Sequence, residues 1–215
     1  MGAVKTRLAR EIGPVAATQF YRTVTANLIR RLGFDPRWRL VLAIAPDRAV
    51  HAPFWPKAVA RIGQGRGDIG ARMERLLRKA GPGPAVLIGS DIPAIAADHI
   101  AAAFEALRRN DAVFGPAADG GFWLVGVKRL PPVTGLFEGV RWSGPHALGD
   151  TLANLARRKI GFAARLADVD GRRSYERSGR TGSCITVLRA DGRSYESASH
   201  THTLPSGSAA LPASP

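Results

Sequence analysis

Cysteine and long apolar runs are nearly absent from this sequence of 215 residues. Its single cysteine, Cys184, excludes an intrachain disulfide and a metal site built from several thiolates. No apolar run approaches the roughly 20 residues needed to cross a bilayer, and the residues that follow Met1 lack the apolar core of a signal peptide. We therefore expect a cytoplasmic protein without a membrane span.

Acidic residues are also scarce, because 17 Asp and Glu face 31 Lys and Arg, which gives a formal net charge of +14. Basic chains often bind nucleic acid or anionic membranes. Here the basic residues are spread along the chain, and pairs such as Arg30-Arg31 and Arg108-Arg109 fall at the ends of predicted helices, where cations suit the helix dipole. No nucleic-acid motif or interleaved aromatic residues accompany them. The charge favours a solvated surface over nucleic-acid binding, and it would attract a phosphorylated substrate.

Apolar residues repeat at helical and strand-like spacings in alternation as far as Leu166. The helical stripes span residues 14–32, 69–77, 100–107 and 148–155. The strand-like runs span residues 39–45, 86–89, 112–114, 122–127 and 162–166. This alternation predicts an α/β protein with a layered sheet, and a hydrophobic content of 45% suits one folded core.

The composition changes at about Ser178, after which Ser, Thr, Gly, Pro and Ala dominate. Segments of this composition bury too little apolar surface to offset the entropy lost on ordering. We therefore divide the chain into a folded domain, residues 1–177, and a low-complexity tail, residues 178–215, which we expect to be disordered.

One apolar run ends in a carboxylate that is well placed for chemistry. The predicted buried strand 86–89 leads to Ser90 and Asp91, and open α/β sheets bind ligands beyond the carboxyl ends of their strands. Asp91 could be a ligand of a hard divalent cation, or the aspartate of a turn before Pro93. Asp168 and Asp170 follow another strand at a spacing that places both on one face, so they could complete a metal site or belong to a solvated strand end.

Other candidate residues also allow two interpretations. The turn Asp119-Gly120-Gly121 offers a second carboxylate on a flexible loop, although Asp-Gly is also a common hairpin turn. Lys5 and Arg7 could neutralise a diphosphate, or simply form a basic terminus.

Two further features concern a glycine-rich loop and a tryptophan. The loop from Gly65 to Gly70 precedes a predicted helix, so its backbone N–H groups could approach a nucleotide, with Asp68 as the helix N-cap, or it could only form a turn. Trp142 could line a pocket or pack in the core.

Taken in chain order, six motifs resemble the DUF2064 family. They are Val4-Lys5-Thr6-Arg7-Leu8-Ala9; Gln64 with Gly67-Asp68-Ile69-Gly70-Ala71-Arg72-Met73; Ile88-Gly89-Ser90-Asp91-Ile92-Pro93; Gly115-Pro116-Ala117 with Asp119-Gly120-Gly121-Phe122-Trp123-Leu124; Leu136-Phe137 with Trp142-Ser143; and Asp168-Val169-Asp170. The resemblance covers residues 2–176. The family is grouped with glycosyltransferase A-like proteins, including a group named for arsenosugar biosynthesis, and is distantly similar to nucleotidyltransferases of molybdenum-cofactor and phospholactate metabolism.

The resemblance implies a three-layer nucleotide-diphospho-sugar transferase fold of the glycosyltransferase A-like type, with a mostly parallel central sheet. Family members usually begin with a strand and a loop ahead of the motif at Val4, and that strand would lie near the centre of the sheet. Since this sequence starts at Met1, we expect a sheet that lacks its first strand and leaves neighbouring backbone groups unpaired.

The resemblance also implies roles for residues. A divalent cation, Mg²⁺ or Mn²⁺, would be held by Asp91, Asp168 and Asp170, and Asp119 would act on the acceptor side as the candidate catalytic base. The remaining candidates would bind the nucleotide-sugar; they are Lys5, Arg7, Gln64, Gly67, Asp68, Gly70, Arg72, Ser90, Gly120, Gly121 and Trp142.

The function implied is that of a metal-dependent glycosyltransferase with a nucleotide-diphospho-sugar donor and an acceptor that the sequence does not identify. Two alternatives stay open. The first is a nucleotidyltransferase that forms a nucleotide-diphospho compound from a nucleoside triphosphate. The second is a non-catalytic protein, either a nucleotide-binding remnant or a basic nucleic-acid binder.

Overall fold

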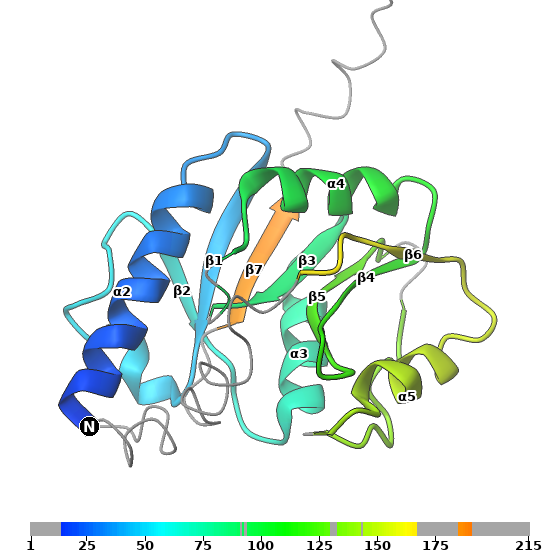
Figure 1. Cartoon of the computed structure of the whole chain (residues 1–215). Coiled ribbons are helices and arrows are strands. Elements are labelled where there is room, and N and C mark those ends of the chain that lie inside the picture. The colour runs from blue at the N-terminus through cyan, green and yellow to red at the C-terminus, as the bar shows by residue number, and fades with distance from the viewer. Residues whose placement is uncertain are drawn as a thin grey trace, which may run out of the picture.

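The computed structural model describes residues 14–90, 92, 94–129, 133–142, 144–166 and 185–190. A β-sheet runs through this part of the chain, with helices on both of its sides (Figure 1). Five of the candidate site residues lie outside the described residues; they are Lys5, Arg7, Asp91, Asp168 and Asp170.

The described elements alternate between helix and strand, as the apolar periodicity predicts. The helices are α2 (Pro14–Leu32), the 3-10 helix η1 (Asp47–His51), α3 (Ile69–Lys79), α4 (Ala97–Leu107) and α5 (Ala147–Ala153). The strands are β1 (Trp38–Ile44), β2 (Ala60–Gly63), β3 (Ala85–Gly89), β4 (Ala112–Pro116), β5 (Phe122–Val127), β6 (Ile160–Phe162) and β7 (Ile185–Ala190).

The sheet has seven strands in the order β2-β1-β7-β3-β5-β4-β6, and it is mixed. Strands β1, β2, β3, β4 and β6 share one direction, while β5 and β7 run against them. Because the two reversed strands are interior, β1–β2 and β4–β6 are the parallel pairs of the described sheet, and its other neighbouring strands are antiparallel. The layered α/β architecture is therefore confirmed.

Strand β7 corrects two expectations from the sequence. It lies within the segment expected to be a disordered tail, and it fills the centre of the sheet, where an open gap was expected. Leu40 of β1 and Val86 of β3 both pair with Leu188, and Val187 and Leu188 are buried. Of the run Ile185-Thr186-Val187-Leu188, three residues are apolar and three are β-branched, which suits a buried strand, but the polar composition of its surroundings hides it.

Two strands, β2 and β6, also differ from the sequence prediction. Strand β2 was not predicted because it has four residues, none of them fully buried, which is too short a run for a clear strand pattern. The predicted strand 162–166 is instead β6, which ends at Phe162. Beyond it, the backbone N–H of Ala163 still donates to Phe114 O at 2.8 Å, but the carbonyl of Ala164 accepts a hydrogen bond from the indole of Trp123.

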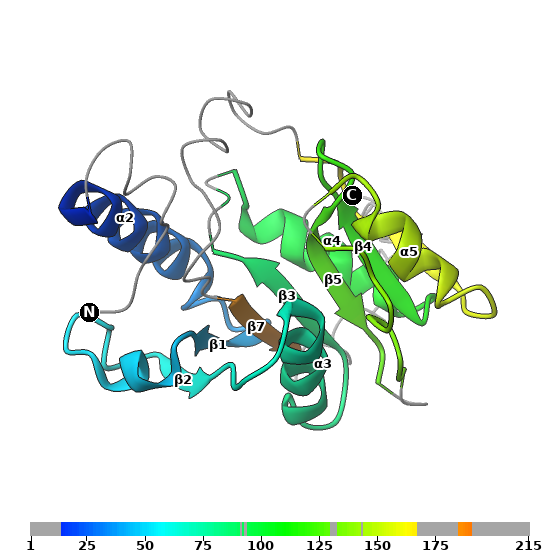
Figure 2. The same ribbon diagram turned by 90° about the horizontal axis from the view of Figure 1, so that it is seen from below.

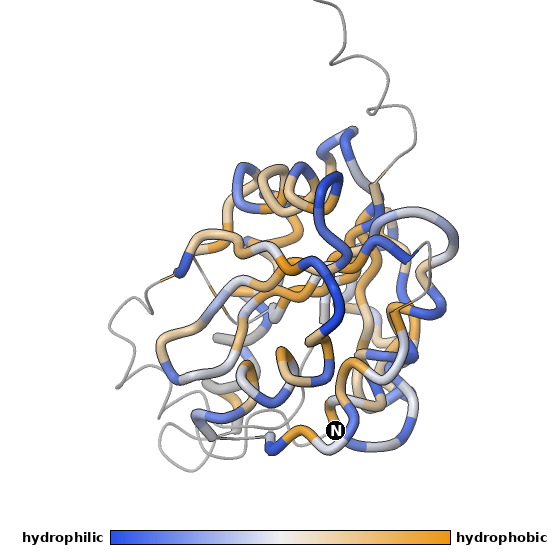
Figure 3. The backbone as a smooth tube through the Cα atoms, turned by 90° about the vertical axis from the view of Figure 1, so that its right-hand side faces the viewer, coloured by the Kyte–Doolittle hydropathy of each residue, from blue (hydrophilic) through white to orange (hydrophobic). Residues whose placement is uncertain are grey.

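Each face of the sheet carries its own apolar cluster. On the first face, α2 and α4 bury Leu32 and Ile100 against the strands, and we call this the α2–α4 cluster. On the second face, α3 and α5 bury Leu76 and Ala147, and this is the α3–α5 cluster. Figure 2 shows the helices on both sides of the sheet, and Figure 3 shows apolar residues gathered in the strands between them. No helix of the described residues is long and apolar enough to cross a membrane.

Candidate functional site

Most described candidate residues gather at one edge of the sheet. Strands β1, β2, β3, β4 and β6 end at this edge and β5 and β7 begin there, so we call it the carboxyl edge. Gln64 follows β2, Ser90 follows β3, and Gly121 precedes β5. Helix α3 also begins here, because it follows β2 and returns to the start of β3. The topology thus brings together motifs that are well separated in the sequence.

Gln64 joins the elements that form this edge. Its side chain is fully buried, and its amide Nε2 donates to the carbonyl of Ala43 at 2.9 Å. Its backbone N–H donates to Ile44 O at 3.1 Å, and Arg75 Nη1 of α3 donates to the carbonyl of Gln64 at 2.7 Å. The structure therefore places Gln64 beneath the edge, where it fixes the ends of β1 and β2 to each other and to α3.

The loop before α3 is held by polar side chains from the loop itself, from α3 and from η1. Asp68 is the N-cap of α3, since its Oδ1 accepts a hydrogen bond from Ala71 N at 2.8 Å, which confirms the prediction. Arg72 Nε donates to Gly67 O at 2.8 Å, and Asp47 Oδ1 accepts from Gly65 N at 3.0 Å. Gly67 has a left-handed φ of 105°, which favours glycine there. The loop is a fixed turn with a helix N-terminus behind it.

Gly70 allows α3 to lie close to an aromatic cluster. A Cβ atom at Gly70 would lie 2.9 Å from both Phe137 Cβ and Trp142 Cζ2. The Trp142 ring lies 5.8 Å from that of Phe137 and 6.3 Å from that of Phe122, centroid to centroid. Trp142 is half-buried and packs against the α3–α5 cluster. One aromatic side chain therefore connects the start of α3 with the start of β5.

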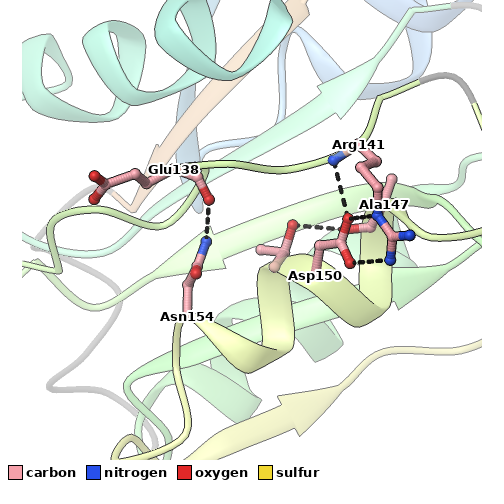
Figure 4. A network of polar contacts seen from close by, with 6 residues as sticks. Glu138, Arg141, Ala147, Asp150 and Asn154 are labelled. Atoms are coloured by element: carbon pink, nitrogen blue, oxygen red, sulfur yellow. Dashed lines mark hydrogen bonds and ion pairs between the residues drawn. The ribbon is translucent and has the colours of Figure 1, made fainter.

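Residues 133–142, which carry Trp142, are fixed to α5 by polar contacts (Figure 4). Arg141 donates from its backbone N, Nε and Nη2 to the carboxylate of Asp150, at 3.0, 2.9 and 2.8 Å. Asn154 Nδ2 donates to the carbonyls of Leu136 and Glu138, at 3.1 and 2.8 Å. The hydrogen bonds from Arg141 hold the pKa of the Asp150 carboxyl well below its ordinary value. These contacts set the position of the segment that ends at Trp142.

The turn between β4 and β5 holds Asp119 at the carboxyl edge. Asp119 is exposed, and its Oδ1 accepts a hydrogen bond from Gly121 N at 3.0 Å. Gly120 has a φ of 82°, and its carbonyl accepts from Leu148 N of α5 at 3.1 Å. The hairpin interpretation of this turn is correct for the backbone, which pairs β4 with β5 in antiparallel fashion. The carboxylate of Asp119 nevertheless points from a rigid turn at the same edge as the other candidates.

The expected metal ligands lie outside the described residues, but their neighbours in sequence are placed. Ser90 is buried at the end of β3, and Ile92 packs against the α2–α4 cluster. Leu166 packs against the same cluster, and Trp123 Nε1 donates to Ala164 O at 3.1 Å just before it. Three carboxylates are a suitable donor set for Mg²⁺ or Mn²⁺. Among the described residues no group of three or more His, Cys, Asp or Glu could hold a metal ion, so the metal site stays a prediction.

Two positioning residues, Glu74 and His99, are not among the candidates from the sequence. Glu74 of α3 accepts a hydrogen bond from Gly135 N at 3.0 Å, which ties residues 133–142 to that helix. His99 lies in the first turn of α4, where its Nδ1 accepts from Ala96 N at 3.1 Å, and its ring lies 5.9 Å from that of Trp123. The capping position of His99 follows from its place three residues after Ala96, but the other contact joins distant parts of the chain.

Comparison with known proteins agrees with the family and the fold that the sequence predicts. Residues 28–144 match the family described as "Uncharacterized protein conserved in bacteria (DUF2064)". A crystal structure of a proposed nucleotide-diphospho-sugar transferase from Desulfovibrio desulfuricans G20 is similar to the chain, with a TM-score of 0.65 and 27% sequence identity. The similarity covers 79% of this chain and 77% of that one. No curated protein sequence matches the chain.

Proposed function

Since the chain belongs to the DUF2064 family, we propose that it is a metal-dependent glycosyltransferase that uses a nucleotide-diphospho-sugar donor. The similarity to a proposed nucleotide-diphospho-sugar transferase supports this class of substrate. The observation that carries the proposal is the convergence of the loop at Gly67, the end of β3 at Ser90 and the turn at Asp119 on one edge of the sheet. Open α/β sheets bind nucleotides at this edge.

The donor would bind through its diphosphate and its ring systems. The N-terminal end of α3 presents backbone N–H groups and the positive end of the helix dipole, both of which suit phosphate oxygens. Arg72 adds a positive charge beside Gly67, since its guanidinium donates to that carbonyl. Half-buried Trp142 would offer an aromatic edge or face to a base or sugar ring. Lys5 and Arg7 complete the proposed phosphate contacts.

Asp91, Asp168 and Asp170 would hold the divalent cation. The bound ion would neutralise charge on the diphosphate leaving group. The acceptor hydroxyl would attack the anomeric carbon while the bond from that carbon to the diphosphate oxygen breaks. Asp119 would take the proton of the acceptor, because its carboxylate is exposed and its orientation is fixed by Gly121 N.

Donor hydrolysis across a panel of nucleotide-diphospho-sugars, with and without Mg²⁺ or Mn²⁺, tests the proposal. We expect Asp91→Asn to lower the rate by about 100-fold or more, as for the loss of other charge-stabilising groups. Asp98→Asn is the matched control, because Asp98 is an exposed residue in the first turn of α4. Its rate should equal that of the wild type.

Two results would count against glycosyl transfer. Pyrophosphate release from a nucleoside triphosphate and a sugar phosphate, without hydrolysis of any nucleotide-sugar, would identify a nucleotidyltransferase. If calorimetry detects no nucleotide binding by the folded protein, both enzyme functions are wrong.

A further inference from the structure

At the edge of the sheet opposite the candidate site, two arginine side chains, Arg129 and Arg189, reach the C-terminal end of α3. Arg78 and Lys79 form the last turn of this helix. Arg129, which follows β5, donates from Nη2 to the carbonyl of Arg78 at 3.1 Å. Arg189 of β7 reaches the same place, since a Cβ atom at Gly81 would lie 3.1 Å from its Nη1. Three segments of the chain thus bring positive charge to residues 78–81.

The helix itself accounts for only part of this arrangement. The C-terminal end of a helix carries a partial charge of about −0.5, which favours one nearby cation. Within the described part of the chain, the ion pairs are Arg37–Asp35, Arg108–Glu105 and Arg141–Asp150. None of them includes a member of this cluster, so no described carboxylate forms an ion pair with it.

Arg129 shows the strain of this arrangement most clearly. Its φ of 67° is left-handed, and among the described residues other than glycine it is alone in this. Its Nη1 is enclosed and has no hydrogen-bond acceptor. Burial, and then the charge of Arg189, lower the pKa of Arg129. A strained residue with a poorly compensated charge is often explained by a ligand.

We propose that the C-terminal end of α3, with Arg129 and Arg189, binds a small phosphate-bearing anion. Guanidinium groups match phosphate oxygens in pairs, and several cations favour an anion with two or more charges over a single carboxylate. The loop that follows α3 is open at Gly83, where a Cβ atom would meet no atom within 4 Å. This site is separate from the carboxyl edge and does not depend on the proposed function.

Thermal unfolding and calorimetry with inorganic pyrophosphate test the proposal, with sodium chloride of equal ionic strength as the reference. We expect pyrophosphate to raise the unfolding temperature of the wild type more than chloride does. The double variant Arg129→Gln with Arg189→Gln should bind pyrophosphate at least about tenfold more weakly. A parallel titration with a nucleoside diphosphate distinguishes free phosphate from a nucleotide as the source of the anion.

The double variant Arg157→Gln with Arg158→Gln is the matched control, because both residues are exposed and the change in charge is the same. It should bind like the wild type. If the Arg129 variant does not fold, Arg189→Gln alone should still weaken binding. Equal stabilisation by pyrophosphate and chloride would overturn the proposal. Equal binding by both double variants would do so too, because the anion would then bind elsewhere, for example at the carboxyl edge.

Discussion

Gly120 is a position in the candidate site where the backbone leaves no room for a side chain. Its φ of 82° favours glycine, and a Cβ atom there would lie 2.4 Å from the carbonyl oxygen of Pro145. The turn that presents Asp119 therefore touches the chain just before α5. Any side chain at Gly120 would push these two segments apart and move the carboxylate.

Comparing Gly120→Ala with Gly139→Ala separates the two effects. Gly139 also has a left-handed φ, 64°, but a Cβ atom there would meet nothing within 4 Å. We expect Gly139→Ala to lower the free energy of unfolding by about 1 kcal/mol, from backbone strain alone. Gly120→Ala should lower it by about 1 to 3 kcal/mol more, because of the clash with Pro145. Urea unfolding measures both, and equal losses would show that the contact with Pro145 yields easily.

Asp150 gives the chain a testable dependence on pH. Its folded pKa is lowered by Arg141 from the ordinary value of 3.8, so the pair stabilises the fold above that pH. As the pH falls below 3.8 through the folded pKa, the unfolded state takes up its proton first and this stabilisation is lost.

We therefore expect Asp150→Asn to be less stable than the wild type at about pH 7, with a difference that shrinks below about pH 4. Urea unfolding over this pH range measures the difference. Glu138→Gln is the control, since Glu138 is an exposed residue on the same segment whose side chain makes none of the contacts to α5. A difference that stays constant down to the acid range would mean that Arg141 does not stabilise the ionised carboxylate.

At the scale of elements, the position of β7 makes its side chains part of the core. Leu188 is fully buried in the α2–α4 cluster, as is Leu42 of the neighbouring β1. We expect Leu188→Ala to lower the free energy of unfolding by about 3 kcal/mol, similar to Leu42→Ala, because each removes a well-packed side chain. Chemical denaturation of the two variants provides the comparison. A loss below about 1 kcal/mol for Leu188→Ala alone would show that β7 contributes little to the folded state.

Elements with a local signal could be predicted from the sequence. Ile69, Met73, Leu76 and Leu77 repeat at helical spacing after the capping residue Asp68, and these residues do form the first turns and inner face of α3. Strand β7 could not be predicted, because its place in the sheet comes from pairing with distant strands rather than from its neighbours in sequence.

For the whole molecule, ordered motifs identified the family and the edge at which the candidate site lies. The contacts that shape this edge were not predictable. Glu74 with Gly135 and Arg141 with Asp150 join residues on different elements, and each residue type is ordinary at its own position. The ligand-binding role that the resemblance implies for Gln64 stays a prediction, and the structure shows its side chain buried beneath the edge.

The central place of β7 also has a consequence for the order in which the chain folds. Within the described sheet, β2 and β1 form one group of paired strands, and β3, β5, β4 and β6 form another. Only β7 joins the two groups by strand pairing. Leu40 of β1 pairs with Leu188 of β7, so this contact closes a very long loop of the chain between the two residues. During synthesis both groups of strands emerge from the ribosome before β7, which joins them. Folding that depends on such distant contacts is slow, and until β7 arrives β1 and β3 present unpaired edges to other chains.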